Sequence, residues 1–202
     1  MTRKEEILYA TLELASEYGL KAVSLGQIAD KVGIKKPSLY NHFASKDEIV
    51  NAMYSELRKQ AQRRNTNSAG FPSLSEDKSL EELLTACCSG YIRFLSDKDM
   101  LTFFKVLYSE RSTSPEAAQI MVEETERMIS NTRSLFYALV VHGKMKNENV
   151  DAAAMSYAFT IHSLVDRQMD IMTANKETIS ITEISEDMKE YSQMVQQTNG
   201  GR

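Results

Sequence analysis

Apolar residues recur at intervals of three and four along almost the whole chain, which is the spacing of one face of an α-helix. No stretch alternates apolar and polar residues between hairpin signals, so no sheet is predicted. The expected fold class is all-α. About nine helices are predicted, near residues 3–18, 25–32, 37–43, 46–64, 79–96, 99–111, 115–142, 148–175 and 181–197.

Turn-forming residues separate the fourth predicted helix from the fifth. Residues 65–78, NTNSAGFPSLSEDK, are rich in Asn, Ser, Gly and Pro and are the best linker candidate. The sequence therefore predicts an N-terminal domain over residues 1–64 and a second helical domain over residues 79–202. Charge divides in the same way, because residues 1–64 carry a net charge of +3 and the remainder carries −7. This asymmetry favours a polyanion contact near the N-terminus.

Composition is that of an ordinary soluble globular protein, with 42% hydrophobic and 26% charged residues. The longest uninterrupted apolar run, residues 135–141, is far shorter than the ~20 residues that a membrane span needs. The N-terminus shows no signal-peptide core, so we expect a cytoplasmic protein. Cys87 and Cys88 are adjacent and cannot close a disulfide loop. The pattern leaves open whether they sense oxidants, bind a soft metal or fill a helical core.

Residues 24–43 contain the most informative pattern. Ser24 begins a predicted helix of about two turns, and Gly33 permits a sharp turn after it. The next short helix begins at Lys36 or Pro37 and has two apolar residues one turn apart, Leu39 and Phe43. Two short helices joined by a glycine turn predict a helix-turn-helix.

The second of these helices carries hydrogen-bond donors on its outer side. Lysine can donate to guanine O6 and N7, asparagine pairs with adenine, and serine and histidine can reach bases or phosphates. Tyr40, and Lys46 in the following helix, can bind phosphates. The alternative is a solvated helical hairpin in an all-helical protein. The outward positions are Lys36, Ser38, Tyr40, Asn41 and His42.

Residues 24–49 resemble the DNA-binding segment of the TetR family of bacterial transcriptional regulators. The family pattern is matched at Val23-Ser24, Ile28-Ala29, Gly33-Ile34, Leu39-Tyr40, His42-Phe43 and Ser45-Lys46-Asp47. The match also follows one N-terminal helix, where the family places it. The resemblance implies DNA contacts at Ser24, Leu25, Gly26, Lys35, Lys36, Pro37, Ser38, Tyr40, Asn41, His42 and Lys46.

One position departs from the family pattern. Many relatives cap the recognition helix with Ser or Thr where this chain has Lys35. The exchange removes a helix cap but adds a cation at the expected DNA surface. Beyond residue 64 the resemblance concerns architecture only.

The last two predicted helices have the apolar pattern of an interface. Helix 148–175 is apolar on two sides, so both sides must be covered. Helix 181–197 has one stripe spaced like a coiled-coil seam. The resemblance also implies dimerisation through these helices, although ordinary packing within one chain is the alternative. The residues expected at a homodimer interface are Val150, Ala154, Tyr157, Ile161, Val165, Ile184, Met188, Tyr191 and Val195.

An effector pocket is expected among the helices of the second domain. Residues of this kind more often fill a core than contact a ligand, and the exceptions are Asp166 and Arg167, which are charges beside apolar faces. The pocket candidates are Tyr91, Phe94, Phe104, Tyr108, Met121, Met128, Phe159, His162 and Asp166.

These features predict a sequence-specific DNA-binding transcriptional regulator, a dimeric repressor that a small-molecule effector releases from a palindromic operator. Two alternatives stay open. One is a helical small-molecule carrier or enzyme-like bundle with a relic DNA-binding domain, and the other is a DNA binder controlled by a protein partner. The three histidines share no metal-ligand spacing and no nucleophile has a base partner. We therefore expect no enzyme, no catalytic residue, no metal site and no cofactor.

Overall fold

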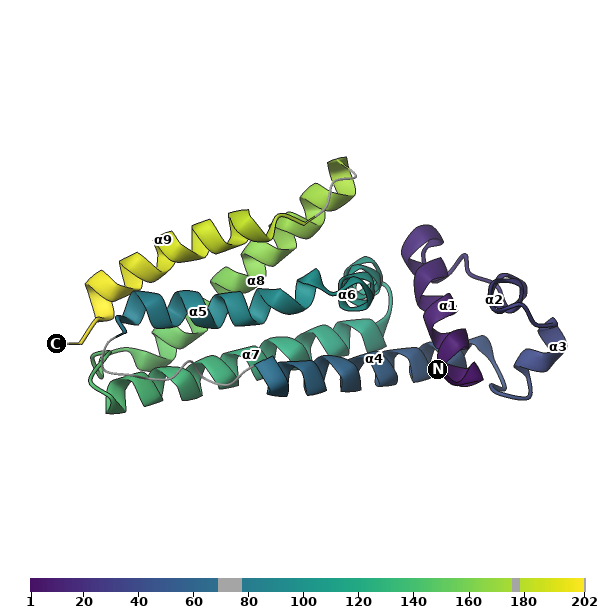
Figure 1. Ribbon diagram of the computed structural model, residues 1–202, viewed down its shortest axis with the longest axis horizontal. Helices are drawn as coiled ribbons and strands as arrows, with labels where there is room; N and C mark the ends of the chain where they lie inside the picture. The colour runs from purple at the N-terminus through teal and green to yellow at the C-terminus, as the bar shows by residue number, and fades with distance from the viewer. Residues whose placement is uncertain (69–77, 176–178, 202) are drawn as a thin grey trace. The chain divides into compact units, whose positions relative to one another are not determined.

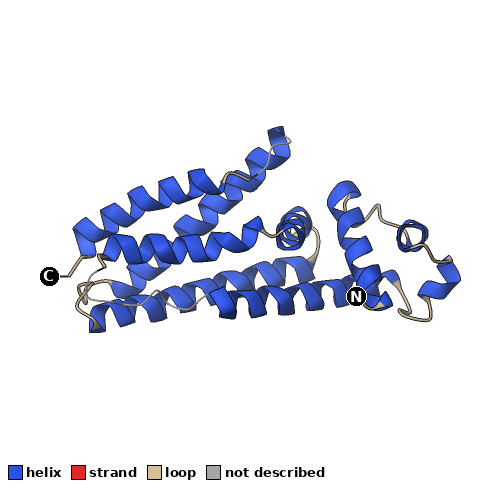
Figure 2. Ribbon diagram, viewed as in Figure 1, coloured by secondary structure: helices blue, strands red, loops and turns tan. Residues whose placement is uncertain are grey.

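The computed structural model describes residues 1–68, 78–175 and 179–201, without the side chains of residues 64–68 and 94. Within these ranges every regular element is a helix (Figure 2), so the predicted all-α class is confirmed. No described helix is long and apolar enough to cross a membrane. The elements are α1 (Arg3–Tyr18), α2 (Leu25–Val32), α3 (Lys36–Leu39), α4 (Lys46–Ser68), α5 (Leu80–Ile92), the 3-10 helix η1 (Arg93–Ser96), α6 (Lys98–Glu110), α7 (Pro115–Val141), α8 (Val150–Asn175) and α9 (Ile181–Asn199).

Three predicted helices differ from the observed ones by more than two residues at one end. Helix α3 ends at Leu39 instead of residue 43, and α5 gives way to η1 after Ile92. Helix α4 continues to Ser68 and so enters the predicted linker. The rest of that linker, residues 69–77, lies outside the described residues. Turn-forming residues shift a helix end only weakly when the preceding turns are already formed.

The chain forms two compact units. The first contains Met1–Asn65 and Asp97–Gln119, and the second contains Thr66–Ser96 and Ile120–Arg202. The unit with the helix-turn-helix is therefore discontinuous in sequence, because α6 packs on α1. The predicted boundary at residues 65–78 places α6 in the second domain, whereas in the structure α6 belongs to the first unit.

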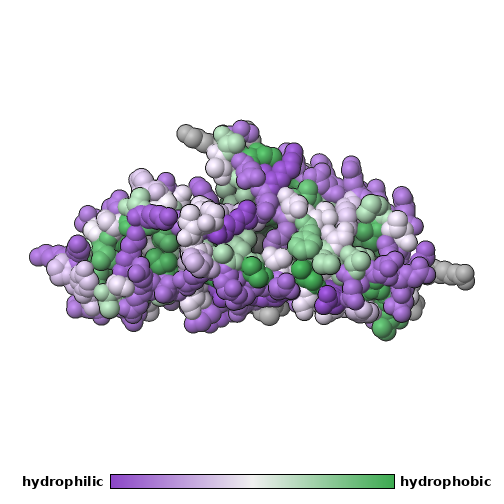
Figure 3. Space-filling model, turned by 180° about the vertical axis from the view of Figure 1, so that it is seen from behind, coloured by the Kyte–Doolittle hydropathy of each residue, from purple (hydrophilic) through white to green (hydrophobic). Residues whose placement is uncertain are grey.

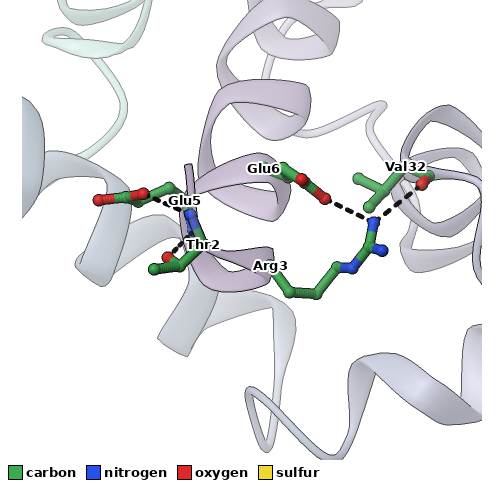
Figure 4. A network of polar contacts seen from close by, with 5 residues as sticks. All are labelled: Thr2, Arg3, Glu5, Glu6 and Val32. Atoms are coloured by element: carbon green, nitrogen blue, oxygen red, sulfur yellow. Dashed lines mark hydrogen bonds and ion pairs between the residues drawn. The ribbon is translucent and has the colours of Figure 1, made fainter.

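Polar contacts join the beginning of α1 to the end of α2 in the first unit (Figure 4). Arg3 pairs with Glu6 one turn later and also donates to the Val32 carbonyl at 3.4 Å. Next to it, Thr2 and Glu5 form a capping box that satisfies donors at the helix start. Of these contacts, the one from Arg3 to Val32 links the two helices.

In the second unit, α9 lies along α5 and also contacts α8 (Figure 1). Tyr157 of α8 is 2% exposed and its hydroxyl donates to the Leu84 carbonyl of α5 at 2.6 Å. Its ring lies 5.6 Å from that of Phe136 and 6.2 Å from that of Tyr191, measured between centroids. Burial raises the pKa of Tyr157 well above its ordinary value, so the hydroxyl stays a donor.

Most residues predicted at the homodimer interface are covered within their own subunit. Eight of the nine are at most 5% exposed there, and Tyr191 is half-buried against Tyr157. Surfaces already covered by the same chain are not available to a partner. A stripe at helical spacing shows that a face is covered but not by which chain, and here α5, α8 and α9 cover one another. The eight buried residues are Val150, Ala154, Tyr157, Ile161, Val165, Ile184, Met188 and Val195.

Candidate nucleic-acid interface

The turn between α2 and α3 depends on Gly33. Its φ of 72° lies in the left-handed region, and its N–H bonds to the carbonyls of Ala29 and Asp30. The next residue, Ile34, also donates to the Ala29 carbonyl, at 2.9 Å. This closes α2 and redirects the chain within three residues, as the glycine predicted.

Helix α3 has only four residues, and a tight turn continues it. Asn41 donates to the Ser38 carbonyl at 3.3 Å, and His42 donates to the Leu39 carbonyl at 2.9 Å. Leu39 and Phe43 are 1% and 6% exposed and anchor the two ends of this segment in the core. The predicted helix over residues 37–43 is therefore one helical turn followed by a turn with i to i−3 bonds.

The predicted DNA-contact residues of this segment lie on its outer side. Lys35, Lys36, Pro37 and Asn41 are exposed, and Tyr40 is 54% exposed. Ser38 and His42 are half-buried. The structure thus brings together the residues that the sequence selected for base and phosphate contacts.

Basic residues of the first unit divide into two groups. Several brace the fold: Lys31 of α2 pairs with Glu13 of α1 at 2.8 Å, and Lys4 lies 5.5 Å above the Phe43 ring centroid. In contrast, Lys35 and Lys36 make no ion pair with any residue that the structure describes. Their charges remain available to an external anion.

Lys46 belongs to the bracing group. Its Nζ donates to the Leu20 carbonyl at 2.7 Å and approaches the Lys21 carbonyl at 3.4 Å, and the side chain is half-buried. The phosphate contact of Lys46 stays a prediction, because without DNA its Nζ is bonded to the α1–α2 loop. Only the fold shows that this loop lies within reach.

Two features at the start of α2 suit a close approach to DNA. Ser24 is exposed, and its Oγ accepts from Gln27 N at 3.2 Å, which leaves the hydroxyl proton free to donate. Gly26 has an ordinary φ, and a Cβ there would meet only Ser24 Oγ, at 3.7 Å. The fold itself does not need a glycine at this position. Leu25, the third predicted contact here, is half-buried.

Lys35 precedes α3 as its N-cap residue and makes no side-chain capping bond. The departure from the family pattern therefore leaves the recognition helix without a side-chain cap, at a typical cost of about 1 kcal/mol. Pro37 partly compensates, since proline is favoured in the first turn of a helix and donates no N–H.

The effector-pocket candidates divide between the two units. In the second unit, Tyr91, His162 and Asp166 are half-buried, whereas Met121 and Met128 are 8% and 7% exposed. Phe104 and Tyr108 belong to the first unit, and the Phe94 side chain lies outside the described residues. Phe159 is 47% exposed, so it lies at the surface of the unit and not in its interior. The remaining second-unit candidates are consistent with an interior site.

The sequence patterns did not mark two charged residues of α7 as candidates for an interior site. Glu124 and Arg127 pair at 2.7 Å, with side chains only 14% and 29% exposed. Burial, together with the nearby Glu124, Cys88 and Asp166, raises the pKa of Tyr91 above its ordinary value. The signal available was a pair of opposite charges three residues apart on one helix.

The two cysteines are poor candidates for redox chemistry. Burial raises the pKa of the Cys87 thiol to about 11, and burial with the adjacent Cys87 raises that of Cys88 to about 12. The thiolate is the reactive form, and it is scarce near neutral pH at such values. Among the described residues, no group of three or more potential ligands gathers for a metal ion.

Two short helices joined by a glycine turn, with basic and amide side chains outward, define a helix-turn-helix DNA-binding domain. A sequence model of the bacterial regulatory proteins of the tetR family matches residues 7–53. A second model, the C-terminal domain of AefR-like transcriptional repressors, matches residues 82–194, more than half of the chain. The chain belongs to the TetR family.

Individual relatives are similar over parts of the chain. The transcriptional repressor KstR2 of Mycobacterium tuberculosis is 42% identical over 52 residues, which span 26% of each protein. The transcriptional activator FasR of Mycolicibacterium smegmatis is 28% identical over 121 residues, 59% of this chain and 52% of FasR. The chain thus matches about a quarter to a half of the length of these curated relatives.

The fold is also similar to solved structures over nearly its whole length. A TetR family transcriptional regulator from Pseudomonas syringae pv. tomato is 22% identical in sequence, with a TM-score of 0.66. The alignment covers 97% of this chain and 96% of that one. This likeness supports the fold alone.

Replacement by methionine should have opposite effects in the two groups of lysines. Lys46→Met should lower the free energy of unfolding by about 1–2 kcal/mol, because two carbonyls lose a charged donor. It should leave the salt dependence of DNA binding nearly unchanged. Lys36→Met should leave stability within about 0.5 kcal/mol and flatten the plot of log affinity against log salt by about one unit. Urea unfolding and DNA titrations at several salt concentrations measure both, and a reversed pattern would contradict the division into two groups.

Gly26→Ala should make the protein more stable and a weaker DNA binder. Alanine is favoured over glycine in a helix by about 0.5–1 kcal/mol, and the added Cβ has room. The same methyl group would obstruct a phosphate backbone that approaches the start of α2. Thermal unfolding and DNA titration give the two signs, and Gly26→Leu should strengthen the second effect. Unchanged DNA affinity for both variants would remove this role of Gly26.

Proposed function

We propose that the protein is a dimeric transcriptional repressor that reads a palindromic operator through α3 and the turn after it. The main support for this proposal is the exposure of Lys36 and Asn41. The apolar residues of the same segment, Leu39 and Phe43, are buried in the core. The match to the C-terminal domain of AefR-like repressors favours repression over activation. Such a regulator acts on chromosomal DNA and hence in the cytoplasm.

The outward residues suit two kinds of contact. Asn41 can pair bidentately with adenine, and Lys36 can donate to guanine. Tyr40 can donate its hydroxyl to a phosphate, and Lys35 adds a second cation beside the backbone. Because α3 is so short, its contacts are confined to a few base pairs, and a second subunit is needed to read a longer site.

The dimer interface that we now propose uses the exposed sides of α8 and α9. Met155 and Phe159 lie one turn apart on α8 and are 43% and 47% exposed, and Met194 of α9 is 48% exposed. A groove of about 400 Å³ lies between these helices, with Ser156 and Tyr191 among its lining residues. Large apolar side chains beside a groove are the features that a symmetric helical interface buries. On the face drawn in Figure 3, hydrophobic residues lie in groups among hydrophilic ones.

A small-molecule effector is proposed to bind within the second unit. The Tyr91 hydroxyl lies in the interior of this unit, and Glu124 and Asp166 are close enough to raise its pKa. His162 Nε2 and Asp166 Oδ1 are buried one turn apart on α8. The effector should therefore carry polar groups next to an apolar part, and it should act by changing the population of the DNA-binding state.

Selection from a random DNA pool tests the reading role directly. The protein should enrich an inverted repeat with half-sites about one helical turn apart, or a multiple of it. Asn41→Ala should cost about 1–3 kcal/mol on the selected site and much less on random DNA. Tyr40→Phe is the control, since loss of a phosphate contact should weaken both similarly. Enrichment of no sequence would contradict operator recognition.

Phe159→Glu should convert the dimer to a monomer, because it places a charge in the apolar centre of the proposed interface. Operator affinity should fall with it, since one half-site supplies only part of the binding free energy. Val122→Glu is the matched control, because Val122 is 55% exposed but lies on α7. Light scattering measures the mass of both variants, and a dimeric Phe159→Glu protein would exclude this face.

A further inference from the structure

Leu20, in the loop between α1 and α2, is hydrogen-bonded through both its N–H and its carbonyl. Its N–H donates to Glu110 Oε1 at 3.1 Å, and its carbonyl accepts from Lys46 Nζ at 2.7 Å. Glu110 is the last residue of α6, whereas Lys46 is the first residue of α4. Three segments that are far apart in sequence thus meet at one residue, and all of them lie in the first unit.

Glu110 occupies an unfavourable place for a carboxylate. It is 8% exposed, and it lies at the C-terminal end of a helix, where the helix dipole disfavours a negative charge. Its influence reaches Tyr54, whose pKa rises to about 12 through burial first and then through the charges of Glu110 and Glu116. A residue that is disfavoured by both burial and the dipole needs a compensating role.

The loop that Glu110 holds determines where α2 begins. Gly19 has a φ of 79° and ends α1, and Ser24 caps α2 five residues later. Leu20 is therefore the first residue of a short connection, so a shift of Leu20 also shifts the start of α2. Since α3 follows α2 through one glycine turn, a displaced loop moves the reading segment as well.

We propose that Glu110 is a positioning residue for DNA reading, which acts through the Leu20 peptide to fix the start of α2 and hence the orientation of α3. This inference rests on the proposed operator binding. Glu110 itself contacts no DNA in this mechanism. A movement of α6 that withdraws the carboxylate releases one side of the loop, while Lys46 still holds the other.

Helix α6 is held in the first unit by more than the bond to Leu20. Helix α6 also packs on α1, and it buries Phe103, Val106 and Leu107 at 0–1% exposure. This apolar contact remains when the carboxylate is removed. Loss of Glu110 should therefore affect the loop and the reading segment more than it affects global stability.

Glu110→Ala should raise the exchange rate of the Leu20 amide proton and weaken operator binding, each by about tenfold, the typical effect of one lost hydrogen bond to a charged group. Binding to random DNA should change much less, because the phosphate contacts do not depend on one orientation of α3. Glu110→Gln retains the acceptor oxygen and should restore both the exchange rate and the operator affinity. Glu116→Ala, an exposed carboxylate of the same unit, is the control.

Amide exchange followed by NMR, together with titrations of operator and random DNA, decides the question. If Glu110→Ala does not melt cooperatively, Glu110→Asp replaces it, since the shorter side chain keeps the charge but cannot reach Leu20. Wild-type operator affinity in a folded variant with a fast-exchanging Leu20 amide overturns the proposal. Parallel loss on operator and random DNA also overturns it. If the wild-type protein prefers no DNA sequence, the proposed function fails, and the Leu20 exchange rate still reports whether Glu110 holds the loop.

Discussion

The structure depends on the fact that a recognition helix of four residues cannot hold its own shape. A helix this short forms almost none of the i to i−4 bonds that make a helix cooperative. Its orientation must therefore come from outside, through the burial of Leu39 and Phe43 and through the helices that surround them. The ion pair between Lys31 and Glu13 and the contact of Arg3 with Val32 serve the same end, because they set α2 against α1.

This requirement explains how the basic residues are used. A surface that binds DNA needs cations, but a fold that must fix a short helix also needs long donors that reach distant carbonyls. The chain uses lysine for both purposes, with Lys46 bonded to the loop and Lys36 left exposed. Net charge alone does not distinguish the two uses. The sign of the N-terminal charge therefore supports DNA binding, whereas the choice of residues that contact DNA follows from the contacts.

Local patterns predicted most of the fold and part of the site. Capping boxes and apolar spacing located α1 and α2 to the residue, because these signals act within one or two turns. The outward set on α3 was also predictable, since it follows from the positions of Leu39 and Phe43. The role of Lys46 and the burial of Ile161 were not predictable, because they depend on residues that are distant in the sequence. Periodicity marked Phe159 as part of an apolar face but did not indicate that this face is exposed.

The discontinuity of the first unit limits how its parts can be exchanged between relatives. Family models divide the chain near the linker, with matches over residues 7–53 and 82–194. A chimaera joined at that division would combine the α1–α2 loop of one parent with the α6 of another. Leu20 would then face a side chain that did not coevolve with it, so grafting of DNA specificity should include residues 97–119 together with residues 1–65.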